Sequence, residues 1–280
     1  MRDLEQTHSG SAASAAFPRP GPVAGAGRGL VQRVDLLSNL LWAELTARYK
    51  TATLGVLWFV LNPLLLMLIL VVVFDHFIKL NIENYPVFVL SALLPWTYFQ
   101  MGVSNAASSI PRASGLVKRV WIPRALIPLS AVLASLVHFL ISLVLLFALM
   151  IAVDLPLTGY ALLIPVAVVL QTALIAGIAL LISSLNVFYR DVEHVLPPAL
   201  IGLFYVTPIF YPLSYVPPAW RDWYIVNPMV GIIEIYRRTL LESALPSADL
   251  LEAAAIGSLV VLVLGVAVFR RSEPYFDDYV

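Results

Sequence analysis

The densest group of side chains that could perform acid/base chemistry is the run Arg190-Asp191-Val192-Glu193-His194. It brings carboxylates, a histidine and a cation within five residues, which are the ingredients of such a site. The same run is also typical of an ordinary loop that ends one helix and begins the next. No second cluster of this kind faces the same side, so the loop interpretation is favoured and no catalytic residue is assigned.

Other chemistries are missing from the sequence. No glycine is followed by lysine, so the chain lacks the glycine-rich phosphate loop that ends in Gly-Lys. There is no cysteine, which excludes a disulfide framework, a Cys-ligated zinc or iron-sulfur site and a thiol nucleophile. No metal site is predicted, and the chain cannot hydrolyse ATP through a phosphate loop of that type.

The chain that carries these residues is very apolar. Of its 280 residues, 60% are hydrophobic and 12% are charged, whereas a soluble domain has about 45–50% apolar and about 25% charged residues. So few charges cannot build a water-facing surface, but they suffice for a lipid-facing one. Lys plus Arg and Asp plus Glu both number 17, so the net charge gives no sign of nucleic-acid binding. The sequence predicts an integral membrane protein.

Six uncharged stretches approach the roughly 20 residues that a helix needs to cross the hydrocarbon layer. They predict an all-α, polytopic membrane protein with six transmembrane helices. The predicted spans are residues 51–74, 86–110, 125–153, 157–185, 195–218 and 253–269.

Two different segments precede the first span. Residues 1–29 are rich in Ser, Ala, Gly and Pro and are expected to be a disordered cytoplasmic tail. Residues 30–50 carry leucine and valine on one helical face and polar side chains on the other. This pattern predicts an amphipathic helix that is too polar to span. It either lies in the membrane interface or packs on a partner subunit.

The positively charged residues are distributed unevenly. Of the 17 Lys and Arg side chains, 13 fall in the N-terminal segment, the loops after the second and fourth spans, and the C-terminus. Because cytoplasmic segments retain positive charge, the sequence predicts a multi-pass protein of the inner (plasma) membrane with both termini cytoplasmic.

Ion-coupled transport lacks the residues that it would need. A proton- or sodium-coupled carrier places ionisable groups at membrane depth, yet the six predicted spans contain no Asp, Glu, Lys or Arg. His138 lies well inside the third span and, with Ser135 and Ser142 close by, is interpreted as hydrogen-bonded structure. Any uphill movement must therefore be powered by another polypeptide that binds a cytoplasmic surface.

The best docking surface for such a polypeptide is the loop 111–124, PRASGLVKRVWIPR, which carries four basic and no acidic residues. A solvated loop explains the charge equally well. It does not explain the apolar side chains clustered in a cytoplasmic turn. The residues predicted to contact the partner are Arg112, Leu116, Val117, Lys118, Arg119, Trp121 and Arg124.

Aromatic side chains are abundant in the predicted spans. A conduit for sugars would use such rings, because the apolar faces of pyranoses stack on them. The fifth span also carries four prolines between residues 197 and 212, so it is expected to be short or broken and to line a lumen. The candidate channel residues are Trp58, Phe59, Trp96, Tyr98, Phe99, Phe204, Tyr205, Phe210 and Tyr211.

The segment 219–252 is neither apolar enough to span nor polar enough to be a free loop. It contains Trp220 and Trp223, aromatic residues of the type that settles at a membrane interface. Asn227-Pro228 would interrupt a helix there. The sequence predicts two short external helices that lie on or dip into the outer leaflet.

Eight short motifs follow one another along the chain. They are RYK at 48–50, LGVLW at 54–58, LNP at 61–63, LPW at 94–96, KRVWIPR at 118–124, FYRDV at 188–192, IFYP at 209–212 and NPM at 227–229. Together they resemble the type 2 permease subunits of ATP-binding-cassette exporters of lipid-linked polysaccharides, the group that carries O-antigen, teichoic acid and galactan. The likeness runs from about Leu36 to the sixth span.

The resemblance implies a homodimer of permease subunits that associates with two copies of a nucleotide-binding ATPase subunit. ATP and Mg would bind that partner, so no cofactor is expected on this chain. The cargo would be a polysaccharide linked to polyprenyl pyrophosphate, moved from the cytoplasm across the inner membrane.

The resemblance also assigns roles within the permease domain 51–280 and the helix before it. Residues 30–50 would be the interface helix, 111–124 the coupling loop, 190–195 the cytoplasmic gate segment and 219–241 the external gate helices. The external gate would include Trp220, Trp223, Asn227 and Pro228. The headgroup entrance and cytoplasmic gate would include Arg48, Lys50, Arg190, Asp191 and Glu193.

Two other functions stay open from the sequence. One is a membrane-embedded enzyme of envelope-polymer assembly that uses the cluster 190–194, and the other is a permease for a small lipid or drug. The motifs favour the polysaccharide exporter over both. They do not distinguish O-antigen, teichoic acid and galactan as the cargo.

Overall fold

The computed structural model describes residues 26–49, 57–115 and 122–279, and every regular element in these ranges is a helix. Residues 37–280 form one compact unit, and the residues before Leu37 belong to a separate one. Helix α1 spans Ala26–Tyr49 and covers most of the amphipathic segment expected at 30–50. The expected tail 1–29 lies almost entirely outside the described residues.

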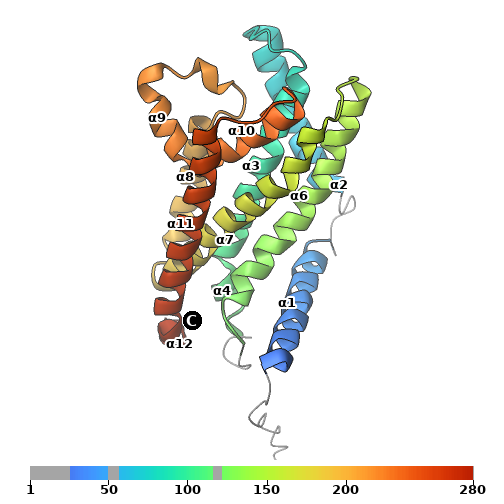
Figure 1. The fold of residues 1–280 in the computed structure, drawn as a ribbon. Coiled ribbons are helices and arrows are strands. Elements are labelled where there is room, and N and C mark those ends of the chain that lie inside the picture. Colours follow the sequence, from blue (N-terminus) through green and yellow to red (C-terminus); the bar gives the residue numbers. More distant parts are fainter. Residues whose placement is uncertain (1–25, 50–56, 116–121, 280) are drawn as a thin grey trace, which may run out of the picture. The chain divides into compact units, whose positions relative to one another are not determined.

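Within the described ranges, five helices are long and apolar enough to cross a membrane (Figure 1). Their bounds lie close to five of the apolar runs, because in lipid a helix satisfies all backbone hydrogen bonds within the segment. They are α2 (Leu57–Leu70) with its π-helical extension η1 (Val71–Phe77), α3 (Tyr85–Ala107), α6 (Leu126–Ala152), α7 (Ile164–Phe188) after the 3-10 turn η2 (Gly159–Leu163), and α11 (Ala248–Ser272).

The fifth predicted span, 195–218, is short and interrupted, as its prolines predict. Its helix, α8, covers only Val192–Val206, which is 15 residues or about 22 Å of helix, so the helix ends 12 residues before the predicted bound at 218. Pro197 and Pro198 lie inside α8 without ending it. The helix stops where Thr207 becomes extended before Pro208, because proline disfavours helical backbone in the residue before it.

Two short helices lie between α8 and α11, as the sequence predicts. They are α9 (Pro218–Val226) and α10 (Pro228–Leu240), preceded by the short 3-10 turn η3 (Leu213–Tyr215). The interruption at Asn227-Pro228 is also confirmed. The Asn227 side chain accepts a hydrogen bond from the Met229 N–H at 3.0 Å, which caps α10 while proline occupies its first position.

Helix α3 occupies the core of the unit and packs against α2, α6, α7, α8 and α10. A buried amide ties three of these helices together. Gln171 of α7 donates from Nε2 to the carbonyl of Pro95 in α3 at 2.6 Å. Its Oε1 accepts from the Tyr236 hydroxyl of α10 at 3.1 Å. Both polar ends of the buried side chain are therefore satisfied, as burial requires.

The chain continues past the last predicted span. Helix α11 extends to Ser272 and is followed by the 3-10 turn η4 (Glu273–Tyr275) and by α12 (Phe276–Tyr279). Phe276 is completely buried in a small second core with residues of α7 and α11. This packing was not predicted, because the segment is short and acidic.

Helices α7 and α11 approach each other closely at two glycines. A Cβ atom added at Gly265 would lie 2.1 Å from the carbonyl oxygen of Gly177, and one added at Gly177 would lie 2.6 Å from the backbone of Leu262. Backbone atoms cannot move aside as a flexible side chain can. Small residues at both positions are therefore a condition of this helix crossing.

We predict that Gly177→Ala and Gly265→Ala each destabilise the protein by about 1–3 kcal/mol, the usual cost of overpacking. The measurement is the midpoint of thermal unfolding of the detergent-solubilised protein. Gly202→Ala in α8 is the matched control, because no heavy atom lies within 4 Å of its added Cβ. Equal midpoints for all three variants would contradict the assignment of a close crossing.

Candidate functional site

One face of α3 is polar within its span. In the second half of this helix, the side chains that are not buried are Thr97, Gln100, Met101, Ser104 and Asn105. Positions 97, 100 and 104 are three and four residues apart, so they lie on one side of the helix. Four of the five open positions are therefore polar in a helix that is otherwise buried.

The exposed side chains of two other spanning helices have the opposite character. Helix α6 exposes Leu140, Ile141 and Val144, and α11 exposes Leu259 and Val263. Such surfaces suit lipid, whereas polar side chains at membrane depth face a water-filled cavity or another polar surface. The open face of α3 is thus distinct from the lipid-facing surfaces. Sequence reasoning missed it, although the helical spacing of 97, 100 and 104 was a usable signal.

A cavity of about 320 Å³ borders this polar face. It combines the polar side chains of Thr97 and Gln100 with the rings of Trp96, Phe204 and Tyr205. Trp96 and Phe204 meet edge to face, with ring centroids 5.7 Å apart. The remaining lining residues are Leu66, Leu93, Leu200 and Ile201, so α2, α3 and α8 all contribute. The wall offers both stacking surfaces and hydrogen-bonding groups.

Aromatic contacts continue from this cavity past the end of α8. Phe204 lies 6.0 Å from Phe210, which lies 5.0 Å from Tyr211, measured between ring centroids. Phe210 also stacks on Phe74 at 4.7 Å. Because residues 207–212 are not helical, the side chains of Phe210 and Tyr211 extend the aromatic surface beyond the helix.

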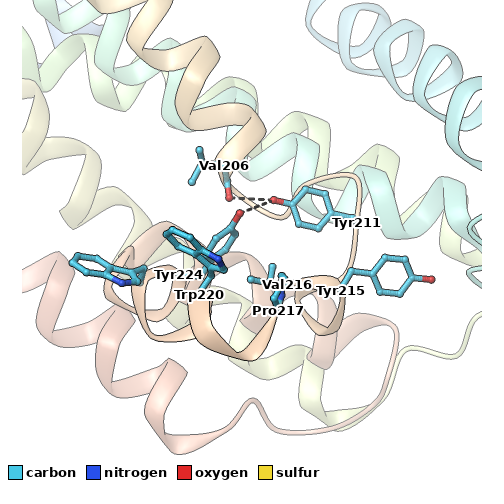
Figure 2. A pocket seen from close by; sticks show the side chains of 8 residues that line it. Val206, Tyr211, Tyr215, Val216, Pro217, Trp220 and Tyr224 are labelled. Atoms are coloured by element: carbon cyan, nitrogen blue, oxygen red, sulfur yellow. Dashed lines mark hydrogen bonds between the residues drawn. The ribbon is translucent and has the colours of Figure 1, made fainter.

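A second cavity, of about 680 Å³, lies beyond Tyr211. Figure 2 shows the hydroxyls of Tyr211 and Tyr224 converging near the backbone carbonyl of Val206. The two hydroxyl oxygens are 3.2 Å apart, and Tyr211 Oη is also 3.2 Å from the carbonyl oxygens of Tyr205 and Val206. A tyrosine hydroxyl is protonated at neutral pH and can donate a hydrogen bond. The other lining residues are Tyr215, Val216, Pro217, Trp220 and Trp223.

Most of the predicted channel aromatics meet at these two cavities. Trp96, Phe204, Tyr205 and Tyr211 line them. Phe99 contacts Trp96, with ring centroids 5.3 Å apart, and Phe210 joins the two cavities through the contacts above.

The other three candidates lie elsewhere. Tyr98 points into the core, stacks on Phe139 at 5.1 Å and donates to the Thr172 hydroxyl at 3.0 Å, so it lines neither cavity. Trp58 lies in the first turn of α2 and is 42% exposed. Phe59 is in α2, and its side chain is outside the described residues.

The predicted gate residues fall on α9 and the start of α10. Trp220 and Trp223 are largely exposed on α9, and both contribute to the larger cavity. Asn227 and Pro228 instead form the helix boundary described above. Pro228 also packs closely on Gly257 of α11, since a Cβ atom added to that glycine would lie 2.9 Å from the Pro228 side chain. The two tryptophans border the cavity while the Asn-Pro pair shapes the backbone.

A buried arginine holds the non-helical segment 207–212 in place. Arg237 of α10 donates from Nη2 to the Ile209 carbonyl at 2.5 Å and from Nη1 to the Tyr211 carbonyl at 3.3 Å. Its guanidinium also lies 3.8 Å from the centre of the Phe88 ring of α3. Glu234 of α10 is 3.5 Å from Nη1 and balances the charge. Arg237 therefore connects α10, α3 and the segment that carries Phe210 and Tyr211.

Burial changes the ionisation of this pair in opposite directions. It lowers the pKa of Arg237 to about 10, although Glu234 favours the charged form. It raises the pKa of Glu234, against the effect of Arg237 and Arg238. At neutral pH the arginine remains a cation and can donate to the carbonyls. Sequence reasoning counted Arg237 only as one of the basic residues outside the spans.

At the opposite end of the unit, Arg112 and Arg124 have partners within the chain. Arg112 donates from Nη2 to the Asn105 carbonyl at 2.7 Å and from Nε to the Ser108 carbonyl at 3.2 Å. These hydrogen bonds satisfy backbone carbonyls at the C-terminal end of α3, next to the short helix α4 (Ser109–Arg112). Arg124 contacts Glu273. The other predicted docking residues, Leu116, Val117, Lys118, Arg119 and Trp121, lie outside the described residues.

The cluster 190–194 lies at an exposed turn and at the start of α8 rather than in a helix of its own. Arg190 and Asp191 are exposed in the turn. Glu193 accepts a hydrogen bond from the Asn186 side chain at 2.8 Å, and the same amide nitrogen donates to the Ala107 carbonyl at 2.9 Å. Among the described residues, no group of His, Asp and Glu is arranged to hold a metal ion.

The two other predicted headgroup residues cannot be placed beside this turn. Arg48 is in α1, but its side chain is outside the described residues, and Lys50 is outside them altogether.

Similar proteins are found along nearly the whole chain. A model of the family described as ABC-2 type transporter matches residues 35–241. The O-antigen export system permease protein RfbA of Myxococcus xanthus is 36% identical over 253 residues, which cover 90% of this chain and 97% of that protein. A protein of the same name from Klebsiella pneumoniae is 29% identical over 246 residues, covering 87% and 94%. The polysialic acid transport protein KpsM of Escherichia coli is 26% identical over 247 residues, covering 87% and 95%.

We predict that Arg237→Met destabilises the protein by about 3–5 kcal/mol, the usual cost of removing one partner of a buried ion pair, because two backbone carbonyls also lose their donor. Arg238→Met is the matched control on the next residue. Its side chain is 37% exposed, and surface ion pairs contribute about 0–1 kcal/mol. The thermal unfolding midpoints of the two purified variants are compared. Similar midpoints would show that Arg237 contributes no more to stability than Arg238 does.

Proposed function

The chain belongs to the ABC-2 type transporter family, and from this membership we propose that it forms the membrane passage of an ATP-driven polysaccharide exporter. It is a transport subunit rather than an enzyme, and ATP hydrolysis takes place on a separate subunit. The proposed cargo is a polysaccharide linked to polyprenyl pyrophosphate, moved from the cytoplasm across the inner membrane. Relatives named for O-antigen export and polysialic acid transport support a polysaccharide as cargo.

The mixed polar and aromatic wall along α3 and α8 carries this proposal. A sugar ring has an apolar face that stacks on aromatic rings and a rim of hydroxyls that needs hydrogen-bond partners. The rings of Trp96, Phe204 and Tyr205 can serve the first, and Thr97 and Gln100 can serve the second. Such a wall binds no single sugar tightly, which suits a polymer that must slide past it.

Two copies of the chain would enclose the passage. In α8, whose residues are all described, Leu200 is the one buried side chain, and only 11% of the span that contains α2 is buried. These helices flank the cavity that opens beside the polar face of α3. A second copy covering α2 and α8 would remove that polar face from lipid. The proposed assembly is a homodimer with two ATP-binding subunits, which bind the ATP and Mg.

The proposed orientation places the α12 end of the unit and both termini in the cytoplasm. The loop 111–124 would then contact the ATP-binding subunit, and the turn at Arg190 would lie where the lipid pyrophosphate enters, together with Arg48 and Lys50. Helices α9 and α10 would lie on the outer side with Trp220 and Trp223 at the exit. The asymmetry of Lys and Arg along the sequence supports this arrangement.

The docking role of the loop is tested by replacing Lys118, Arg119 and Trp121 together with alanine. We expect the variant to reach the membrane normally, to co-purify poorly with the ATP-binding subunit, and to lose surface polysaccharide. Co-purification and surface polymer are measured in the same cells. Export at the normal level would refute docking through this loop.

The passage wall is tested by Gln100→Leu, which keeps side-chain size but removes the amide. Because a hydrogen bond contributes about 1 kcal/mol, we expect export to fall about fivefold while the ATP-binding subunit still co-purifies. Met101→Leu is the control, since it alters the neighbouring position without removing a polar group. Wild-type export by Gln100→Leu would mean that the polar face of α3 does not contact the cargo.

A further inference from the structure

The C-terminal segment 273–279 is fastened to the end of the loop 111–124 by two hydrogen bonds. The backbone N–H of Arg124 donates to Oε1 of Glu273 at 3.2 Å, and Arg124 Nη1 donates to the Glu273 carbonyl oxygen at 2.6 Å. The two residues are 149 positions apart in the sequence. The last residue of the loop is therefore held by the first residue after α11.

Apolar contacts fasten the same segment to the end of α7. Phe276 is completely buried, with its ring centroid 5.4 Å from that of Phe269 and 6.0 Å from that of Phe188. Tyr279 meets Phe188 edge to face at 5.0 Å. The small core around Phe276 also contains Ile110, Leu180 and Val187. It joins α4, α7, α11 and the C-terminal segment.

These two attachments lie next to the parts that would move during transport. Arg124 directly ends the loop proposed to dock the ATP-binding subunit. Phe188 is the last residue of α7 and is followed by the turn that begins α8. Helix α8 in turn supplies Phe204 and Tyr205 to the passage wall. Side-chain contacts thus link Arg124 to Phe188, and the chain itself links Phe188 to α8.

We infer that Glu273 and Phe276 are positioning residues that transmit movement of the loop 111–124 to the turn before α8. The inference rests on the proposed function, because it takes the loop as the docking surface. When the loop moves, Arg124 displaces Glu273, and the ring of Phe276 displaces Phe188. Without the segment, the loop would move on the ATP-binding subunit while α8 stayed in place.

The test uses the complex of this chain with its ATP-binding subunit and the variants Glu273→Ala and Phe276→Ala. We expect both complexes to hydrolyse ATP at a rate close to wild type while export falls severalfold. Glu273→Gln is the conservative control, because its side-chain oxygen still accepts from the Arg124 N–H, and export should recover. Tyr275→Ala is the positional control, because Tyr275 is 58% exposed.

A second readout follows the movement itself. The chain contains no cysteine, so Ile201→Cys in α8 places a single thiol at the smaller cavity. In the otherwise unchanged chain we expect the rate of thiol labelling to change when ATP is added to the complex. In combination with Glu273→Ala, the labelling rate should no longer respond to ATP.

Three results would overturn the inference. In the first, Glu273→Ala and Phe276→Ala export as much polysaccharide as wild type. In the second, ATP hydrolysis and export both fall in proportion to the amount of assembled protein, which would indicate that the two residues have a purely structural role. The ATP response at position 201 could also persist in Glu273→Ala. Failure of the proposed function has a different signature, since the unmodified chain would then neither bind an ATP-binding subunit nor support polysaccharide export.

Discussion

The arrangement of the candidate passage depends on how the backbone is satisfied where α8 ends early. A non-helical segment beside a lipid-facing helix needs a donor for nearly every carbonyl. Tyr211 Oη approaches the carbonyls of Tyr205 and Val206, and the Ile209 N–H donates to that of Thr207 at 2.7 Å. The Tyr85 hydroxyl donates to the Phe210 carbonyl at 2.8 Å, and Arg237 donates to those of Ile209 and Tyr211. Donors from α3 and α10 therefore make the break in α8 possible.

This backbone arrangement also explains where the aromatic side chains lie. Had α8 continued to Pro218, Phe210 and Tyr211 would have followed the helical spacing set by Phe204 and Tyr205. Instead, the extended backbone turns Phe210 back toward Phe204 and Phe74 and carries Tyr211 to the larger cavity. The two cavities are joined by one set of touching rings because the helix is interrupted between them.

The sequence predicted those features that depend on local composition and missed those that depend on packing. Apolar runs located five of the six predicted spans, because a spanning helix forms its backbone hydrogen bonds within its own segment. Asn227-Pro228 located the boundary between α9 and α10. Hydropathy extended the fifth span to Pro218 because it does not register a lost hydrogen bond at proline. Hydropathy also could not show that Tyr98 points into the core while Phe99 contacts Trp96, because the two residues differ only in the direction that they take around α3. It could not show that Arg237 is buried either, because the residues that bury it are distant in the sequence.

The burial of Arg237 limits how the α9–α10 end of the unit can open. Moving α10 away from the segment 207–212 would separate a buried cation from the carbonyls of Ile209 and Tyr211, which costs more than parting apolar surfaces because the donor and acceptors would lose their hydrogen bonds. The segment and α10 must therefore move together, with Phe210 and Tyr211 carried along. Any opening at this end would then fall on contacts that involve no buried charge, such as those of Trp220 and Trp223 on α9, which are largely exposed.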